Sequence, residues 1–161
     1  MIADACASTF LHPGDVVCAH RGDRLETLLG SCVAIILTDP RRTVGAMCHI
    51  VHANRATTTA RLSNCHASTA LATMYRLITN EGFAPHLCKA YVYGGGNMFP
   101  ALSSSHRPQS HVGDVNARWV LQALQQDGVE VIHQDLGGGT YRRVAWTIGT
   151  QAPQVAAVKV A

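Results

Sequence analysis

The segment LGSCVAIILT, residues 29–38, decides the fold of this chain. Its last six residues are a continuous run of mostly β-branched and aliphatic side chains, the pattern of a strand buried on both faces. The turn-forming sequence DPRR follows at residues 39–42, and a second apolar segment at residues 44–51 returns as a hairpin partner. The sequence therefore predicts a buried antiparallel strand pair.

More strands and two helices are expected on either side of this pair. Two segments carry apolar residues at three- and four-residue spacing and predict amphipathic helices, at residues 67–78 and 112–126. Short apolar segments bounded by glycine or polar residues predict strands at residues 15–20, 88–93, 129–134, 141–148 and 154–160. This order predicts a mixed α/β (α+β) domain with largely antiparallel strands.

The domain organisation follows from length and composition. With 161 residues, 47% of them hydrophobic and 14% charged, the chain has enough material for one packed domain and is not a disordered protein. Residues 1–14 end at Pro13-Gly14 and are expected to form a loosely ordered N-terminal arm. Residues 15–161 are expected to form a single domain.

Charge and hydropathy exclude several classes of partner. The net charge of +3 is scattered, with no basic stripe carrying interleaved aromatic residues, so no nucleic-acid partner is expected. No stretch approaches the roughly 18 to 20 apolar residues that a membrane span needs, so no membrane insertion is expected. The six cysteines include no C-x-x-C pair and no secretory signal is visible, which favours a cytoplasmic protein with free thiols.

Chemistry is concentrated at Cys32 and at His49 in the sequence GAMCH. Gly30 and Ser31 form a turn that places Cys32 at the entrance of an apolar strand, and the hairpin brings His49 back beside it. An imidazole beside a thiol raises the thiolate fraction and makes cysteine a nucleophile. Backbone N–H groups in such a turn can stabilise an oxyanion. The pair predicts acyl chemistry.

Two other interpretations of these residues remain open. Free cysteine is among the most buried residue types, so Cys32 can also be a small core residue. His49, His52, Cys65 and His66 contain ligand types suited to zinc, but their spacing matches no known zinc pattern, and no metal is expected.

The glycine-rich run Gly94-Gly95-Gly96-Asn97 follows a predicted strand. A phosphate-binding loop would need a G-x-G-x-x-G run into a helix or a following Lys-Ser/Thr pair, and neither is present. A turn that lets backbone approach an active site or a partner is the better interpretation.

Taken together, five motifs resemble the CheD family, the bacterial chemoreceptor glutamine deamidases. The resemblance runs from about residue 15 to residue 160, with the motifs in the family's order. The motifs are TLLGSCVA (27–34), GAMCH (45–49), YGGGNMF (93–99), Gly113-x-x-Asn116, and DLGG (135–138) with Arg142-Arg143.

The resemblance implies a fold, an activity and partners. The fold is a layered α/β/β/α sandwich, similar to the catalytic domain of bacterial toxins that deamidate Rho proteins. The activity is that of a protein-glutamine glutaminase: hydrolysis of selected glutamine side chains on the cytoplasmic domains of chemoreceptors to glutamate, with release of ammonia and without a cofactor. A CheC-like phosphatase, which acts on CheY-phosphate, is the further partner implied.

The resemblance also implies roles for individual residues. Cys32 corresponds to the family's nucleophile and His49 to its general base, with the family's spacing intact. The oxyanion and the approaching substrate are expected to meet residues of the two glycine turns, namely Gly30, Ser31, Gly95 and Asn97.

The family's third catalytic residue does not align directly. Family members carry a threonine six positions before the cysteine, where this chain has Glu26, and Thr27 follows one position later. Glu26 can serve as an acidic orienting group, a local bulge can present Thr27 instead, or this copy is weakened. The last alternative leaves room for a non-catalytic binding module that regulates a phosphatase or a receptor.

Overall fold

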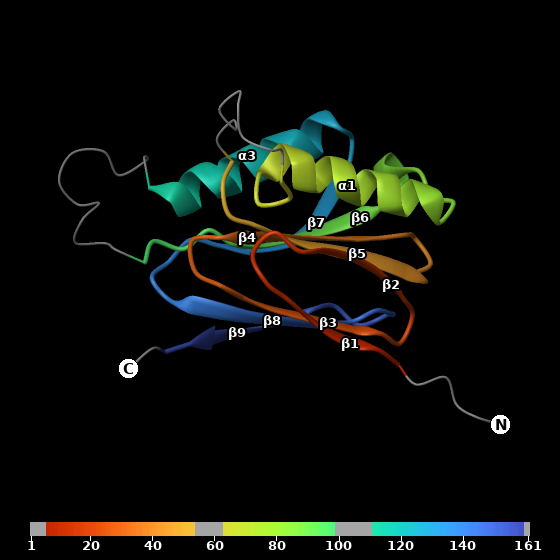
Figure 1. The fold of residues 1–161 in the computed structure, drawn as a ribbon, viewed down its shortest axis with the longest axis horizontal. Helices are drawn as coiled ribbons and strands as arrows, with labels where there is room; N and C mark the ends of the chain where they lie inside the picture. Colours follow the sequence, from red (N-terminus) through yellow and green to blue (C-terminus); the bar gives the residue numbers. More distant parts are fainter. Residues whose placement is uncertain (1–5, 54–62, 99–110, 160–161) are drawn as a thin grey trace.

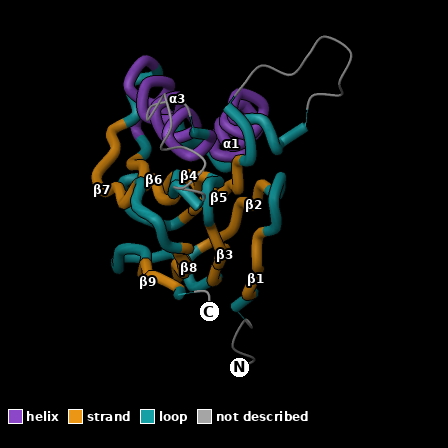
Figure 2. Tube along the Cα trace, turned by 90° about the vertical axis from the view of Figure 1, so that its left-hand side faces the viewer, coloured by secondary structure: helices purple, strands orange, loops and turns teal. Residues whose placement is uncertain are grey.

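The computed structural model describes residues 6–53, 63–98 and 111–159. Two β-sheets are stacked on each other, and helices α1 and α3 both cover the outer face of the larger sheet (Figure 1). The view turned by 90° shows the same three layers (Figure 2). The predicted mixed, layered sandwich is confirmed. Within the described ranges its layers run helix, sheet, sheet.

The larger sheet has five strands and contains the segment that decides the fold. Every residue of its central strand is buried, as the unbroken apolar run predicts. Neighbouring strands are antiparallel except for the pair β6 and β7. In spatial order the strands are β2 (Val16–His20), β5 (Val44–Ile50), β4 (Val33–Thr38), β6 (Lys89–Gly94) and β7 (Glu130–Leu136).

The smaller sheet has four strands and packs against the other face of the larger one (Figure 1). Its neighbours are antiparallel except for the pair β1 and β3. In spatial order they are β1 (Ser8–Leu11), β3 (Arg24–Leu29), β8 (Tyr141–Thr147) and β9 (Gln154–Val158). A second apolar core lies between the two sheets and includes Trp146, Tyr91 and Tyr93.

Both predicted helices are present, as α1 (Ala67–Asn80) and α3 (Val112–Gln126), with a short 3-10 turn η1 at Pro85–Leu87. Each buries one stripe against the larger sheet, which is why the helical spacing of apolar residues could be recognised in the sequence. Both begin at the same end of the sheet (Figure 1). At that end the Ala67 N–H donates to the His52 carbonyl just beyond β5.

The N-terminal segment differs from the expected loosely ordered arm. Residues 8–11 form β1, which pairs in parallel with β3, and Leu11 is fully buried between the sheets. The strand is only four residues long, too short for a clear alternation in the sequence, and long-range pairing with β3 fixes it. Residues 1–5 lie outside the described ranges.

Candidate functional site

Cys32 lies in the turn between β3 and β4, at the edge of the core between the two sheets. Ala34, two residues further on, pairs directly with His49 of β5. Side chains two residues apart on a strand share a face, so Cys32, Ala34 and His49 all point towards the space between the sheets. Cys32 lies one residue before β4, so it is placed diagonally to His49 on the same face, just beyond the end of the antiparallel pair.

His49 is held from the smaller sheet by a threonine. Thr27 Oγ1 lies 2.8 Å from His49 Nδ1 and also 2.8 Å from the Leu11 carbonyl oxygen. Thr27 is fully buried and His49 is 4% exposed, so water does not compete for these bonds. A carbonyl can only accept, so the single hydroxyl proton goes to Leu11, and the hydroxyl oxygen accepts from Nδ1–H. This arrangement leaves Nε2 of His49 as the unprotonated nitrogen.

Glu26 points away from His49. Its carboxylate accepts a hydrogen bond from Arg24 Nε at 2.6 Å, on the outer face of the smaller sheet. The pairing of β3 with β8 is continuous from Arg24 to Leu29, so no bulge is needed to turn Thr27 inward. Of the two orienting residues considered from the sequence, the structure brings Thr27 to the histidine.

Burial sets the protonation of the pair. It lowers the pKa of His49, partly offset by the charge of Asp15, so the imidazole is neutral near pH 7. Burial, with a smaller contribution from Cys65, raises the pKa of the Cys32 thiol. The sequence predicts a raised thiolate fraction at Cys32, whereas burial acts in the opposite direction. Burial therefore favours a neutral thiol and a neutral imidazole.

The glycine-rich run after β6 packs directly onto the turn that carries Cys32. Gly95 N–H donates to the Cys32 carbonyl and Gly96 N–H donates to the Gly30 carbonyl, both at 2.9 Å. Gly94 has a φ of +112°, and a Cβ there would lie 2.2 Å from the Cys32 carbonyl oxygen, so only glycine fits.

The predicted oxyanion residues thus fall into two groups. The backbone N–H groups of Gly95 and Asn97 are used within the protein, on the carbonyls of Cys32 and Gly138. By contrast, the N–H groups of Ser31 and Cys32 donate to no acceptor among the residues that the structure describes. Among the described residues of these two turns, the unused N–H groups of Ser31 and Cys32 therefore lie in the turn before β4, and the glycine-rich run supports that turn by hydrogen bonds.

Arg142 contacts the backbone at the end of β6, beside the glycine-rich run. Its guanidinium is almost fully buried and donates to the carbonyls of Gly94 and Gly137, while pairing with Asp135. The sequence singled out Arg142 only as part of a motif. Its buried contacts could not be read from local pattern, because they join β8 to the ends of β6 and β7.

Other sites considered from the sequence are not assembled. Within residues 6–53, 63–98 and 111–159, no three His, Cys, Asp or Glu side chains are placed to hold a metal ion. His52 and His66 lie near each other, with ring centroids 5.8 Å apart. In the same ranges, no helix is long and apolar enough to cross a membrane.

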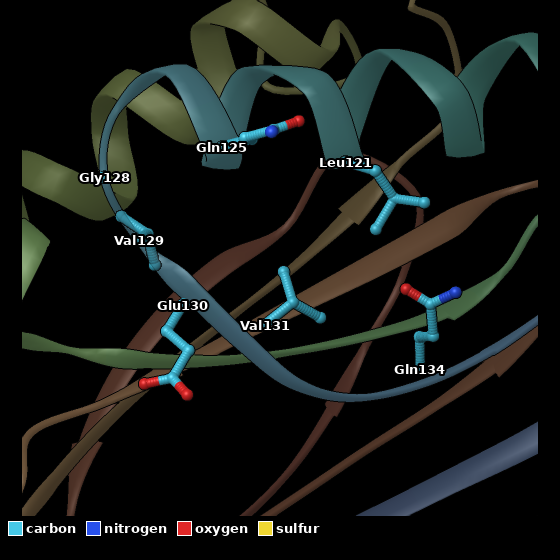
Figure 3. A pocket seen from close by; sticks show the side chains of 7 residues that line it. All are labelled: Leu121, Gln125, Gly128, Val129, Glu130, Val131 and Gln134. Carbon is cyan, nitrogen blue, oxygen red and sulfur yellow. The ribbon is translucent and has the colours of Figure 1, made fainter.

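A separate groove, which Cys32 does not line, lies between α3 and β7 (Figure 3). It contains no cysteine or histidine, and its one carboxylate, Glu130, pairs with Lys89. Its lining residues are Leu121, Gln125, Gly128, Val129, Glu130, Val131 and Gln134. The groove therefore lacks the side chains for nucleophilic chemistry.

A family model described as CheD chemotactic sensory transduction matches residues 52–156, a span that begins after Cys32 and His49. A solved Neisseria meningitidis protein of the DUF152 family aligns over 84% of this chain and 65% of its own, with 15% identity and a TM-score of 0.49.

Two curated relatives are more similar. A probable chemoreceptor glutamine deamidase CheD of Pseudomonas syringae pv. syringae is 35% identical over 145 residues, covering 88% of this chain and 80% of the relative. A probable chemoreceptor glutamine deamidase CheD 1 of Chromobacterium violaceum is 37% identical over 150 residues, covering 89% and 74%. The chain belongs to the CheD family.

Proposed function

We propose that this protein is a protein-glutamine glutaminase that deamidates glutamine side chains on the cytoplasmic domains of chemoreceptors. The proposal rests on family membership and on one observation: His49, fixed by Thr27, lies on the same buried face as Cys32. A nucleophile, a base and a group that orients the base are the parts that acyl transfer needs.

In the first half of the reaction Cys32 is the nucleophile. His49 Nε2 accepts the thiol proton while the sulfur attacks the carboxamide carbon of the glutamine. The N–H groups of Ser31 and Cys32, which have no acceptor among the described residues, stabilise the oxyanion that forms. The protonated imidazole then gives its proton to the leaving nitrogen, ammonia departs, and a thioester to Cys32 remains.

In the second half His49 activates water. The imidazole takes a proton from a water molecule as its oxygen attacks the thioester carbon, and the collapsing intermediate expels the Cys32 sulfur. The sulfur recovers a proton from the imidazolium. The sum is glutamine plus water giving glutamate plus ammonia. Thr27 keeps Nδ1 protonated and stabilises the imidazolium in both halves.

The cellular setting follows from this substrate. Chemoreceptor signalling domains lie in the cytoplasm, so we expect the enzyme there, and the six free cysteines suit a reducing compartment. A CheC-like phosphatase is the second protein partner that we propose from the family resemblance.

A non-catalytic binding module is the alternative from another functional class. The sequence leaves room for this alternative because Glu26 occupies the position at which the family carries its threonine. The hydrogen bond from His49 to Thr27 supports the enzyme over the binding module, since a side chain able to orient the imidazole lies one residue later.

Deamidation of a receptor fragment tests the proposal. We expect the protein to raise the mass of specific glutamine-containing peptides by about one dalton, with release of one equivalent of ammonia. Cys32→Ala should abolish the change, whereas Cys18→Ala, a matched loss of a half-buried thiol on β2, should retain it. Binding of the fragment without any mass change in the wild type would instead support the binding module.

A further inference from the structure

Asn116 is a buried side chain that joins both halves of the candidate site to α3. It is 1% exposed. Its Nδ2 group donates to the Ser31 carbonyl at 3.3 Å and to the Val51 carbonyl at 3.0 Å. Its Oδ1 accepts from the Ala53 N–H at 2.8 Å. Both amide protons and the amide oxygen are therefore used.

These bonds fix the orientation of the amide. Reversing it would place Oδ1 against two carbonyl oxygens, Ser31 and Val51, and Nδ2 against the Ala53 N–H, leaving like groups facing each other without a bond. Water cannot readily reach a side chain that is 1% exposed, so leaving these groups without partners is strongly unfavourable. Asn116 therefore has one stable orientation.

The two carbonyls flank the reacting residues. Ser31 directly precedes Cys32, and Val51 lies two residues after His49. At this end the β4–β5 ladder stops at the pair Val33 and Ile50, so no ladder hydrogen bond joins Ser31 and Cys32 to the segment that follows β5. We propose that Asn116 is a positioning residue, which sets the separation of the Cys32 thiol and the His49 imidazole. This inference rests on the proposed function.

The hydrogen bond from Asn116 to the Ser31 carbonyl also orients the Cys32 N–H, one of the two proposed oxyanion donors. In a trans peptide the carbonyl and the following N–H point in opposite directions. Asn116 holds the Ser31 carbonyl, so the Cys32 N–H on the other side of that peptide points away from Asn116. The Cys32 carbonyl is held separately by Gly95, so the plane on each side of Cys32 is fixed.

Gly113 explains how α3 brings Asn116 so close. A Cβ at position 113 would lie 2.4 Å from the Gly96 carbonyl oxygen and 2.6 Å from the Gly95 carbonyl carbon. Without one, the first turn of α3 rests directly on this backbone. Residues three apart share a helix face, so Asn116 is presented to the same end of the sheet.

Asn116→Asp isolates the two donor bonds. It keeps the size of the side chain and an oxygen for the Ala53 N–H, and it removes both donors. Asn116→Ala serves where the aspartate variant does not fold. Thr38→Val is the matched control, because it also removes a buried donor to a backbone carbonyl, that of Val44, at the opposite end of β4.

Deamidation kinetics on a receptor fragment give the first readout, at a temperature where all variants are folded. We expect both Asn116 variants to lower kcat by roughly 10- to 100-fold with little change in KM. Thr38→Val should lower the melting temperature and leave kcat within about twofold. Equal kcat losses in Thr38→Val and Asn116→Asp would overturn the inference while leaving the proposed function intact.

Alkylation of Cys32 by iodoacetamide gives a second readout, independent of any substrate. His49→Ala should slow the reaction near pH 7.5, because the base is lost. Asn116→Asp should slow it too, and the variant with both changes should be no slower than His49→Ala. Alkylation of Asn116→Asp at the wild-type rate contradicts the positioning role, even if the wild type proves to have no deamidase activity.

Discussion

Thr27 Oγ1 bridges His49 Nδ1 and the Leu11 carbonyl oxygen, at 2.8 Å from each. Three strands meet in this relay: β1 supplies the carbonyl, β3 the hydroxyl and β5 the imidazole. Because the Thr27 hydroxyl donates its one hydrogen bond to the Leu11 carbonyl, its oxygen can only accept a hydrogen bond from the histidine. The N-terminal strand thereby determines which nitrogen of His49 is left unprotonated.

Thr27 and Glu26 should differ sharply in their effect on activity. Thr27→Val removes the acceptor from Nδ1 and should lower kcat by roughly 10- to 100-fold, whereas Thr27→Ser should restore most of it. Glu26→Gln breaks only a partly exposed pair with Arg24 and should leave kcat within about twofold. Steady-state deamidation kinetics decide between them, and a larger loss in Glu26→Gln would reverse the assignment.

The acid limb of the pH–rate profile should lie below the usual histidine range. The base must be neutral to accept the thiol proton, and burial lowers the pKa of His49. The value of kcat/KM should therefore stay level as pH falls from 8 towards the ordinary histidine pKa of about 6.5, and decline only below it. A midpoint above pH 7 would be inconsistent with a buried neutral imidazole.

Thiol titration should show a neutral resting pair. Burial raises the pKa of Cys32, so the pH dependence of its alkylation should have a midpoint above the free-thiol value of about 8.5. The rate of carboxamidomethylation at Cys32, followed by peptide mass spectrometry from pH 6 to 10, gives this midpoint. A midpoint below pH 7 would indicate a thiolate–imidazolium pair instead.

Gly94 should be intolerant of any side chain. Gly94→Ala would force the Cys32 carbonyl to move, and we expect a loss of at least about 2 kcal/mol in the free energy of unfolding, with loss of activity. Gly82→Ala is the control, with a similar φ of +95° and open space around it. It should cost about 1–2 kcal/mol and spare kcat. Urea unfolding and deamidation rates measure both.

The order of the longer strands and helices along the chain could be predicted from the sequence, because it depends on the local spacing of apolar residues. The unbroken apolar run of β4 and the helical spacing in α1 and α3 each identify themselves within a few residues. β1 could not be recognised, since its four residues become a strand only by pairing with β3, which follows more than ten residues later.

The site was predictable to the same extent. The proximity of Cys32 and His49 could be predicted because a hairpin brings their two segments together. The register of that hairpin then places both side chains on one face of the sheet. Three other residues make contacts between segments that are distant in the sequence. Thr27 contacts His49, Asn116 contacts two backbone carbonyls, and Arg142 contacts the glycine-rich turn. No local spacing encodes such contacts. Choosing between Glu26 and Thr27 needed the register of β3 with β8.

The most direct test of the relay is a double-mutant cycle on Thr27 and His49. Deamidation rates of a receptor fragment would be measured for the wild type, Thr27→Val, His49→Gln and the variant with both changes. If Thr27 acts only through the imidazole, His49→Gln lowers kcat by roughly 10²- to 10⁴-fold, and adding Thr27→Val lowers it no further. Two losses that multiply, or a Thr27→Val enzyme as fast as the wild type, would contradict the account.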